Sequence, residues 1–266
     1  MTRPRRKNGA PICGTLAVLR CALTDAVARP AAFWSQIGAM VANDLAMIAF
    51  WVIFFNRVQT VRGWDAHRVF LLFAVLATSV GLVLGVLSNC RRLPEIVQSG
   101  ALDEALALPV YPLRYLLVRR TDPVNLGDVV VGVVLFAVTG HPTPQRVAVF
   151  GLGVMISVTL LAAFLVTVGS TVFFTGRGEP GSLSMHAVLL LAGYPADIFT
   201  GAAKALLYTL VPAAFVAAVP ARLIDAPDAA DARWLLLATA VFVGLAVTTF
   251  SLGLRRYTSG SAWGRG

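Results

Sequence analysis

An acidic residue inside an apolar run is the clearest sign of chemistry in this chain. Asn43 and Asp44 lie within the apolar stretch 32–55, which carries Trp34 and Trp51 near its two ends. An ionised Asp near the centre of a membrane helix costs about 2.5–3.5 kcal/mol on insertion scales, so such a residue usually faces a cavity or a partner. Three interpretations stay open: contact with a polar or cationic substrate, a structural hydrogen bond to a neighbouring helix, or a span that begins later and leaves Asp44 near the inner interface.

A second group of acidic residues lies in the connector 89–126, which is far longer than a join between two membrane helices requires. Its apolar residues recur at near-helical spacing from Glu95 onward. The pattern predicts an amphipathic helix that is broken at Gly100 and ended by Pro109, followed by a second stretch able to lie on lipid. The helix has Ile96, Val97, Ala101, Leu102, Ala105 and Leu106 as apolar members and Glu95, Gln98, Asp103 and Glu104 on its other faces, and the second stretch contains Tyr111, Leu113, Leu116 and Leu117.

Two interpretations of this connector compete. It is either an interfacial helix that merely joins two spans, or a rigid element whose short polar tip docks into a groove on a soluble partner. The clustered carboxylates favour docking, because anionic lipid repels an acidic tip whereas a basic protein surface attracts it.

Enzymatic chemistry has no support in the sequence. No nucleophile and base, paired carboxylates or metal-ligand spacing emerges, and His67, His141 and His186 are scattered. No Gly-x-x-x-x-Gly-Lys-Ser/Thr loop is present, so the chain is not expected to hold ATP or magnesium itself. Lys204 is expected to snorkel or to meet Asp197. We therefore expect no catalytic residue, no metal site and no cofactor in this chain.

The elements that must position these residues are long apolar helices. The runs 69–88, 147–174 and 234–254 contain no Asp, Glu, Lys or Arg, and about 20 such residues suffice to cross the hydrocarbon as a helix. Hydrophobic residues make up 58% of the chain and charged residues 13%, with a mean hydropathy of +0.78. The sequence predicts an all-α, polytopic membrane protein. Within the second span, Gly81-x-x-x-Gly85 would let another helix approach closely.

Charge decides the number of crossings. A weaker span is expected at 125–140, and two apolar pieces, 183–192 and 202–219, precede the last span. With six crossings and the N-terminus inside, fifteen of the 22 Lys and Arg fall on the inner side and six on the outer side, as the positive-inside rule requires. Six transmembrane helices are therefore expected, with both termini cytoplasmic. One of the two pieces must then be a re-entrant or interfacial hairpin.

The chain divides into a short tail and one membrane domain. Residues 1–31 are expected to form a cytoplasmic basic tail and an interfacial amphipathic helix, and residues 32–266 the transmembrane domain. The net charge of +9 comes from residues that flank the spans, so it sets topology and indicates no nucleic-acid partner.

Short motifs spread over the membrane domain add a resemblance. In its motifs the chain resembles the permease subunits of type-2 ATP-binding cassette (ABC) exporters, in the viologen- or multidrug-exporter-like subfamily. The matching residues are Gly63-Trp64, Gly100-Ala101-Leu102-Asp103 with Leu106 and Pro109, Tyr194-Pro195, Pro212-Ala213-Ala214-Phe215 with Pro220-Ala221, and Arg255-Arg256-Tyr257-Thr258-Ser259. Leu108 departs from the pattern, because relatives tend to carry a basic residue there.

The resemblance implies a six-helix half-transporter in a bacterial plasma membrane. It would pair with a second permease, identical or homologous, and with two ATPase subunits that bind ATP and magnesium, and it would export an amphipathic or hydrophobic, drug-like small molecule. A secondary transporter or channel, or a membrane assembly factor without transport, is the alternative. The expected coupling residues are Glu95, Gly100, Leu102, Asp103, Glu104, Leu106 and Pro109, and Asn43, Asp44, Tyr194, Pro195 and Pro212 are expected along the substrate pathway, the last three in a re-entrant cap.

Overall fold

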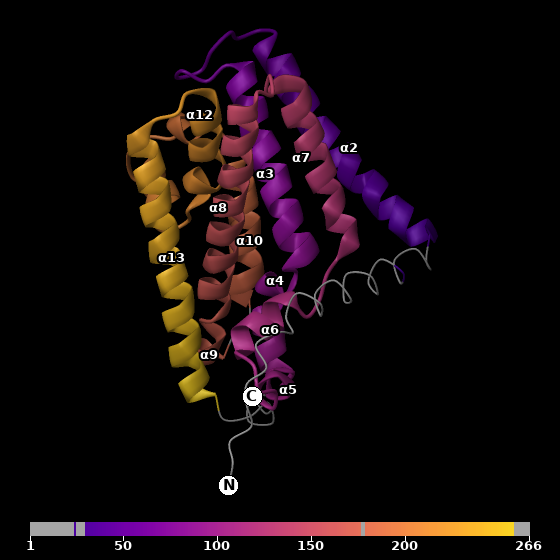
Figure 1. Ribbon diagram of the computed structural model, residues 1–266, viewed down its shortest axis with the longest axis vertical. Helices are drawn as coiled ribbons and strands as arrows, with labels where there is room; N and C mark the ends of the chain where they lie inside the picture. The colour runs from indigo at the N-terminus through magenta and orange to yellow at the C-terminus, as the bar shows by residue number, and fades with distance from the viewer. Residues whose placement is uncertain (1–23, 25–29, 177–178, 258–266) are drawn as a thin grey trace.

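A computed structural model describes residue 24 and residues 30–176 and 179–257, and this part of the chain is helical (Figure 1). Extended structure there is limited to one isolated bridge between Val61 and Trp64. The α-helices are α2 (Pro30–Phe55), α3 (Ala66–Val86), α4 (Asn89–Gln98), α5 (Leu102–Leu106), α6 (Pro112–Val118), α7 (Leu126–Thr139), α8 (Pro144–Gly169), α9 (Val172–Thr175), α10 (Glu179–Ala192), α11 (Gly201–Thr209), α12 (Val219–Asp225) and α13 (Ala229–Arg256).

A few long helices of the described chain could span a membrane. Four segments of the described chain are long and apolar enough to cross a bilayer: Phe33–Phe55, Ala66–Gln98, Pro144–Thr175 and Ala229–Arg256. Two bent pairs, α6 with Pro123–Thr139 and α11 with Ala214–Asp225, raise this number to six if each pair is one span. The prediction of an all-helical polytopic membrane protein is confirmed.

Helix α3 forms the centre of the bundle, and α2 lies at its edge. In the most apolar part of the span that contains α3, 78% of the residues are buried, against 6% for α2. Helices α7, α8 and α12 all pack against α3. Figure 1 shows α2 and α7 on one side of α3 and α8 and α13 on the other. Asp65 is the N-cap residue of α3, and its carboxylate accepts a hydrogen bond of 2.9 Å from the backbone N–H of Arg68.

Glycines allow α3 and α7 to approach closely. A Cβ atom on Gly81 would lie 2.7 Å from the backbone nitrogen of Val129, and one on Gly85 would lie 2.6 Å from the side chain of Leu126. Gly132 of α7 faces the Ala74 carbonyl in the same way. The expected close approach at Gly81 and Gly85 is therefore confirmed, and the neighbour is α7 of the same chain.

The segment before the last span is broken, as expected. Helix α10 ends at Ala192, and α11 is followed by a π-helical turn, Ala214–Ala218, that leads into α12. The axis bends by 69° between α11 and this second part. Figure 1 places α12 at one end of the bundle, which we call the far end. The opposite end, which carries α4, α5 and α6, is the elbow end.

Two expectations about the connector are wrong in detail. Its first helix begins at Asn89 rather than Glu95, because α4 continues α3 after an interruption at Leu87 and Ser88. Leu113 and Leu116, expected on lipid, are buried within the protein because α6 packs against α4 and α5. The tail and amphipathic helix expected at 1–31 fall almost entirely outside the described residues, as do Thr258 and Ser259.

The glycine contact between α3 and α7 generates a prediction about stability. Replacing Gly81 by Leu should overpack this interface against backbone atoms that cannot move aside, at a cost of about 2 kcal/mol or more. Thermal unfolding of the detergent-solubilised protein should therefore show a lower midpoint. Gly151→Leu is the matched control, because no atom lies within 4 Å of a Cβ there. Equal midpoints for the two variants would contradict the α3–α7 packing described above.

Candidate functional site

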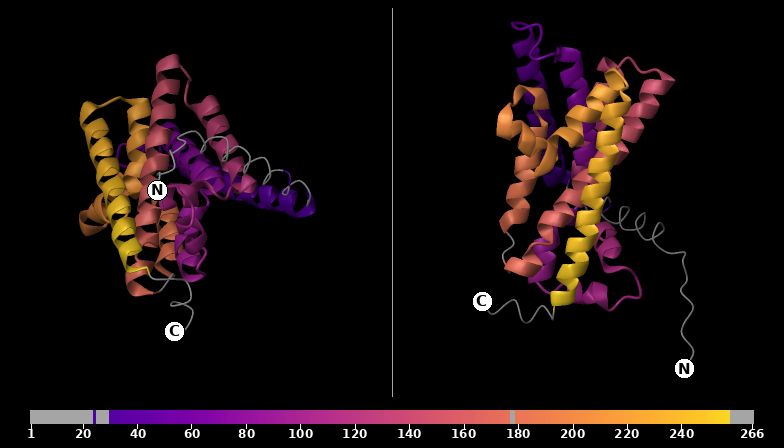
Figure 2. Two further views of the ribbon diagram at one scale, coloured as in Figure 1. Left: turned by 60° about the horizontal axis from the view of Figure 1, so that its bottom comes forward. Right: turned by 90° about the vertical axis from the view of Figure 1, so that its left-hand side faces the viewer.

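The elbow, Asn89–Val118, is the first candidate site. It comprises α4, α5 and α6, which lie beyond the lower ends of α2 and α7 in Figure 1 and beside the lower end of α13 in the right-hand view of Figure 2. Leu93 and Val97 of α4 are buried. A Cβ on Gly169 of α8 would lie 3.2 Å from the Cβ of Leu93, so α4 rests directly on the end of α8.

Hydrogen bonds from polar side chains to backbone carbonyls fix the elbow on both of its flanks. The Asn89 side chain donates to the Leu116 carbonyl at 2.7 Å, and the Ser88 hydroxyl donates to the Arg120 carbonyl at 2.9 Å. On the other side, the Gln98 amide donates to the Gly176 carbonyl at 2.9 Å. Ser88 and Asn89 are buried, and Gln98 is exposed. Buried polar groups that are paired stabilise one arrangement, so the bonds of Ser88 and Asn89 hold the elbow as part of the bundle.

The turn between α4 and α5 depends on Gly100. Its φ of +76° lies in the left-handed region that favours glycine. This turn folds α5 back so that Leu102 and Ala105 are fully buried. Leu102 therefore anchors the elbow to the protein, whereas Leu106 remains on the surface.

The carboxylates of the elbow have partners within the chain. Glu95 pairs with Arg92 at 2.9 Å, and Glu104 pairs with Arg119 at 2.6 Å. Asp103 lies near Tyr257, which follows α13, and burial together with the neighbouring Asp103 carboxylate raises the pKa of Tyr257 to about 12. The acidic charge expected at the tip is thus partly neutralised, and Asp103 connects the elbow with the last helix.

The tip of the elbow is apolar and exposed. From the last residue of α5 to the residue before α6, the exposed fractions are 41% for Leu106, 40% for Leu108, 49% for Val110 and 50% for Tyr111. We call these four residues the apolar tip, and exposed Pro109 lies at its centre. Single exposed apolar residues are ordinary, but several on one short projecting segment are typical of a contact surface.

A cavity between α2, α3, α7 and α10 is the second candidate site. It has a volume of about 220 Å³, and Asn43, Asp44 and Asp128 are among its lining residues. Of the five residues expected along a substrate pathway, it brings together Asn43 and Asp44. Tyr194, Pro195 and Pro212 do not line it: Tyr194 packs on Trp51 with ring centroids 6.0 Å apart, and Pro195 and Pro212 are buried.

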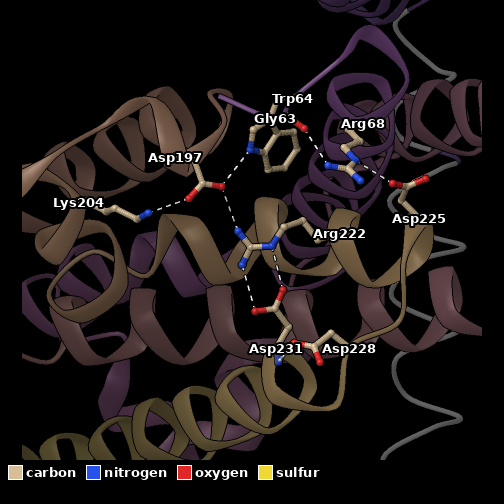
Figure 3. Close-up of polar contacts among 9 residues, drawn as sticks. All are labelled: Gly63, Trp64, Arg68, Asp197, Lys204, Arg222, Asp225, Asp228 and Asp231. Atoms are coloured by element: carbon tan, nitrogen blue, oxygen red, sulfur yellow. Dashed lines mark hydrogen bonds and ion pairs between the residues drawn. The ribbon is translucent and has the colours of Figure 1, made fainter. Parts of the chain in front are cut away.

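A network of ion pairs closes the far end of the bundle (Figure 3). The Asp197 carboxylate accepts hydrogen bonds from Trp64 at 3.0 Å, from Lys204 at 2.8 Å and from Arg222 at 3.1 Å. The expected contact between Lys204 and Asp197 is therefore confirmed. Since Trp64 precedes α3 and Arg222 belongs to α12, Asp197 joins the broken segment to the central helix.

Two further ion pairs extend this network to neighbouring helices. Arg222 also binds Asp231 of α13 through two nitrogens, at 2.9 and 3.2 Å. Arg68 of α3 pairs with Asp225 at the end of α12, at 2.7 Å. Arg–carboxylate pairs with two parallel bonds are among the stronger and more directional ion pairs, so α12 is held firmly between α3 and α13.

Sequence reasoning missed several of these residues. Arg222, Asp231 and Asp128 received no site role from the sequence alone. Two signals were available: Arg222 lies on the side that is poor in basic residues, and Asp128 opens an apolar run. Neither signal says which partner the chain supplies, because that depends on the path of α12 and α7.

Comparison with known families decides the class of protein. The sequence model of ABC-2 family transporter proteins matches residues 41–261, which is most of the chain. The chain belongs to this ABC-2 family. Neither the curated proteins nor the solved structures give a match. As an ABC-2 permease the chain is a multi-pass, non-catalytic membrane component of a transporter, and this family membership implies association with a separate ATPase subunit.

The Asp197 network generates a prediction about pH. Burial alone would raise the pKa of Asp197, but hydrogen bonds from Lys204 and Trp64 and the charge of Arg222 outweigh burial and bring it below the ordinary value of 3.8. A carboxyl group of this kind stabilises the fold above its unfolded pKa, and this stabilisation is lost as the pH falls through its folded pKa. Asp197→Asn should therefore be less stable than the wild type at about pH 6, and the difference should shrink below about pH 4.

Thermal unfolding of the solubilised ABC-2 protein over a pH series measures this difference. The control is Asp122→Asn, because Asp122 lies near the end of α3 that leads into the elbow, where its backbone N–H donates to the Gly85 carbonyl at 2.8 Å. A gap between the wild type and Asp197→Asn that stays constant down to about pH 3 would contradict the role of the ionised carboxylate.

Proposed function

We propose that this chain is the permease subunit of an ATP-driven exporter of the viologen- or multidrug-exporter-like subfamily. In this proposal it pairs with a second permease, identical or homologous, and two ATPase subunits dock on its cytoplasmic side and hold the ATP and magnesium. Alternating access then moves an amphipathic or hydrophobic small molecule out across the bacterial plasma membrane. Membership of the ABC-2 family supports this proposal, and so does the geometry of the elbow.

The apolar tip is the observation that carries the proposal. A surface that must transmit force needs a rigid support and a free face. Leu102 and Ala105 supply the buried support, and Leu106 and Leu108 supply part of the free face. A soluble partner with an apolar groove would bury this face, whereas the far end of the bundle is closed by its own ion pairs.

Docking in this proposal depends on apolar contact more than on acidic charge. Glu95 and Glu104 are already paired with arginines of the same chain, so their attraction for a basic partner is reduced. The carboxylates then stabilise the shape of the elbow, and Leu108 occupies the position where relatives tend to carry a basic residue. Gly100 and Pro109 set the turns on either side of α5, and Asp103 links the elbow to the end of α13.

The proposed topology has six spans, formed by α2, α3, α7, α8, α10 and α13. It therefore assigns the fifth span to α10, which has 14 residues, and does not count the bent pair of α11 and Ala214–Asp225 as a span. The hairpin of α11 and α12 is then a re-entrant cap at the outer side, and both termini are cytoplasmic. Two observations support this arrangement. The broken backbone of Ala214–Ala218 is buried within the protein, where it can be satisfied, and Arg91, Arg92, Arg119 and Arg120 flank the helices at the elbow end.

A secondary transporter or channel is the competing function. It would use intramembrane carboxylates for ion coupling, and Asp128 joins Asp44 in one cavity. Proteoliposomes that contain the permease without an ATPase separate the two functions. Substrate movement driven by a proton gradient alone would favour the competing function, and movement that requires the ATPase subunit and ATP would favour the exporter.

Introducing one charged residue at the apolar tip tests its proposed role in docking. Leu108→Glu should leave membrane insertion intact but lower the substrate-stimulated ATPase activity of the reconstituted complex by about tenfold or more, because a buried unpaired carboxylate weakens the contact. Val58→Glu is the matched control, since Val58 is comparably exposed (37%) at the far end. Full stimulation in Leu108→Glu, or an equal loss in both variants, would remove the coupling role of the tip.

A further inference from the structure

Two arginines lie where the elbow joins the membrane helices. Arg91 belongs to the first turn of α4, and Arg120 follows α6. Both residues are exposed, and neither forms an ion pair with another residue of the part of the chain that the structure describes. We call Arg91 and Arg120 the arginine pair.

The backbone brings the arginine pair together at Ser88. The Ser88 hydroxyl donates to the Arg120 carbonyl at 2.9 Å. Ser88 has helical backbone angles, φ −55° and ψ −24°, and leads directly into α4. Residues three positions apart in a helix are neighbours on one side of it, so Arg91 lies one turn from the residue that holds Arg120. Both long side chains therefore start close to the same point of the elbow.

The basic residues next to the arginine pair in the sequence already have partners. Arg92 binds Glu95 at 2.9 Å, and Arg119 binds Glu104 at 2.6 Å. These two carboxylates are therefore taken. Within the described chain the arginine pair keeps two uncompensated positive charges, which favour an anion from outside the protein.

The arginine pair lies at the level where the apolar helices end. The backbone N–H of Asp122 donates to the Gly85 carbonyl at 2.8 Å, so the residues after Arg120 run beside the last turn of α3. Helix α7 then begins, and Val130 and Val134 on it are exposed apolar residues that hydrocarbon chains can cover. In a bilayer the ends of apolar helices lie among the lipid headgroups, where long basic side chains reach the phosphates.

From this combination we propose that the arginine pair binds the phosphate of one anionic phospholipid, of the phosphatidylglycerol type, in the leaflet at the elbow end. The guanidinium groups of Arg91 and Arg120 donate to the phosphate oxygens, since their planar shape matches phosphate geometry. The acyl chains lie against the apolar surface of α7. The bound lipid links α4 to the connector that leads into α7, and so it fixes the joint between the elbow and the membrane helices. This binding site does not depend on the proposed export function.

The net charge of the headgroup sets the selectivity of the site. Two positive charges held close together repel each other, and one phosphate between them removes this repulsion. A zwitterionic lipid carries an ammonium group that competes with the arginine pair for the same phosphate, so it should bind less tightly. A soluble phosphate compound has no acyl chains, so it gains nothing from the apolar surface of α7.

Native mass spectrometry of the full chain, released from detergent micelles, measures this binding one lipid at a time. The probes are dioleoylphosphatidylglycerol and dioleoylphosphatidylcholine, which share their acyl chains and differ in the net charge of the headgroup. We expect the first phosphatidylglycerol to bind about tenfold more tightly than the first phosphatidylcholine. Glycerophosphoglycerol, which is the anionic headgroup without its chains, should not displace the lipid even in large excess.

Substitutions assign this binding to the arginine pair. Arg91→Gln and Arg120→Gln should each weaken the first phosphatidylglycerol step about fivefold, which is the contribution of one basic residue at an anionic membrane surface. The double variant should weaken this same step further and leave the second step unchanged, because both arginines hold one lipid. Arg57→Gln is the matched control, since Arg57 is exposed and has no ion pair within the described chain but lies at the far end. The thermal midpoint of each variant without added lipid shows that the fold persists.

Four results would overturn the proposal. They are first steps of equal strength for the two lipids, unchanged binding in both single Gln variants of the arginine pair, an equal loss in Arg57→Gln, and displacement of the lipid by glycerophosphoglycerol. Weakening of two separate steps in the double variant would show two lipids in place of a shared one and would overturn it as well. Because no ATPase takes part, each of these results would leave the coupling role of the apolar tip untouched.

Discussion

The buried contact between the elbow and the ends of α3 and α8 is the interaction on which the rest of the structure depends. Leu93 and Val97 of α4 and Leu102 of α5 are all but fully buried, so a displacement of the elbow must displace the helices beneath it. Helix α4 follows α3 after an interruption of only two residues. Because α3 is the most buried span and α7 packs against it through glycines, a force applied at the apolar tip reaches the centre of the bundle.

The two ends of the bundle are built by different physical means. At the elbow end, apolar burial and hydrogen bonds to backbone carbonyls hold short helices together, and an apolar surface stays exposed. At the far end, Asp197, Arg222 and Asp231 form a network of ion pairs that closes on itself. The charges of the far-end network pair with one another, whereas burial of an exposed apolar surface against a partner lowers the free energy. This difference supports the proposed docking of a soluble subunit at the elbow rather than at the broken hairpin.

Much of the fold could be predicted from the sequence, because apolar length and helical spacing are local signals. The spans, the break at Gly100 and the close approach at Gly81 and Gly85 belong to this class. The site could be predicted only in part. Asp44 is anomalous in any apolar run, but its association with Asp128 depends on how α2 and α7 cross, and the burial of Leu113 and Leu116 depends on how α6 folds back onto α4. Such long-range contacts leave no periodic trace in the sequence.

Photocrosslinking from the apolar tip tests the central claim most directly. Benzoylphenylalanine placed at position 108 of the full chain in native membranes should crosslink to a second polypeptide, and mass spectrometry should identify in it the Gly-x-x-x-x-Gly-Lys-Ser/Thr loop of an ATPase. The same group at position 58, at the far end of the bundle, should give no such product. Crosslinks from position 108 that reach lipid alone, or an ATPase crosslink from position 58 instead, would contradict the account.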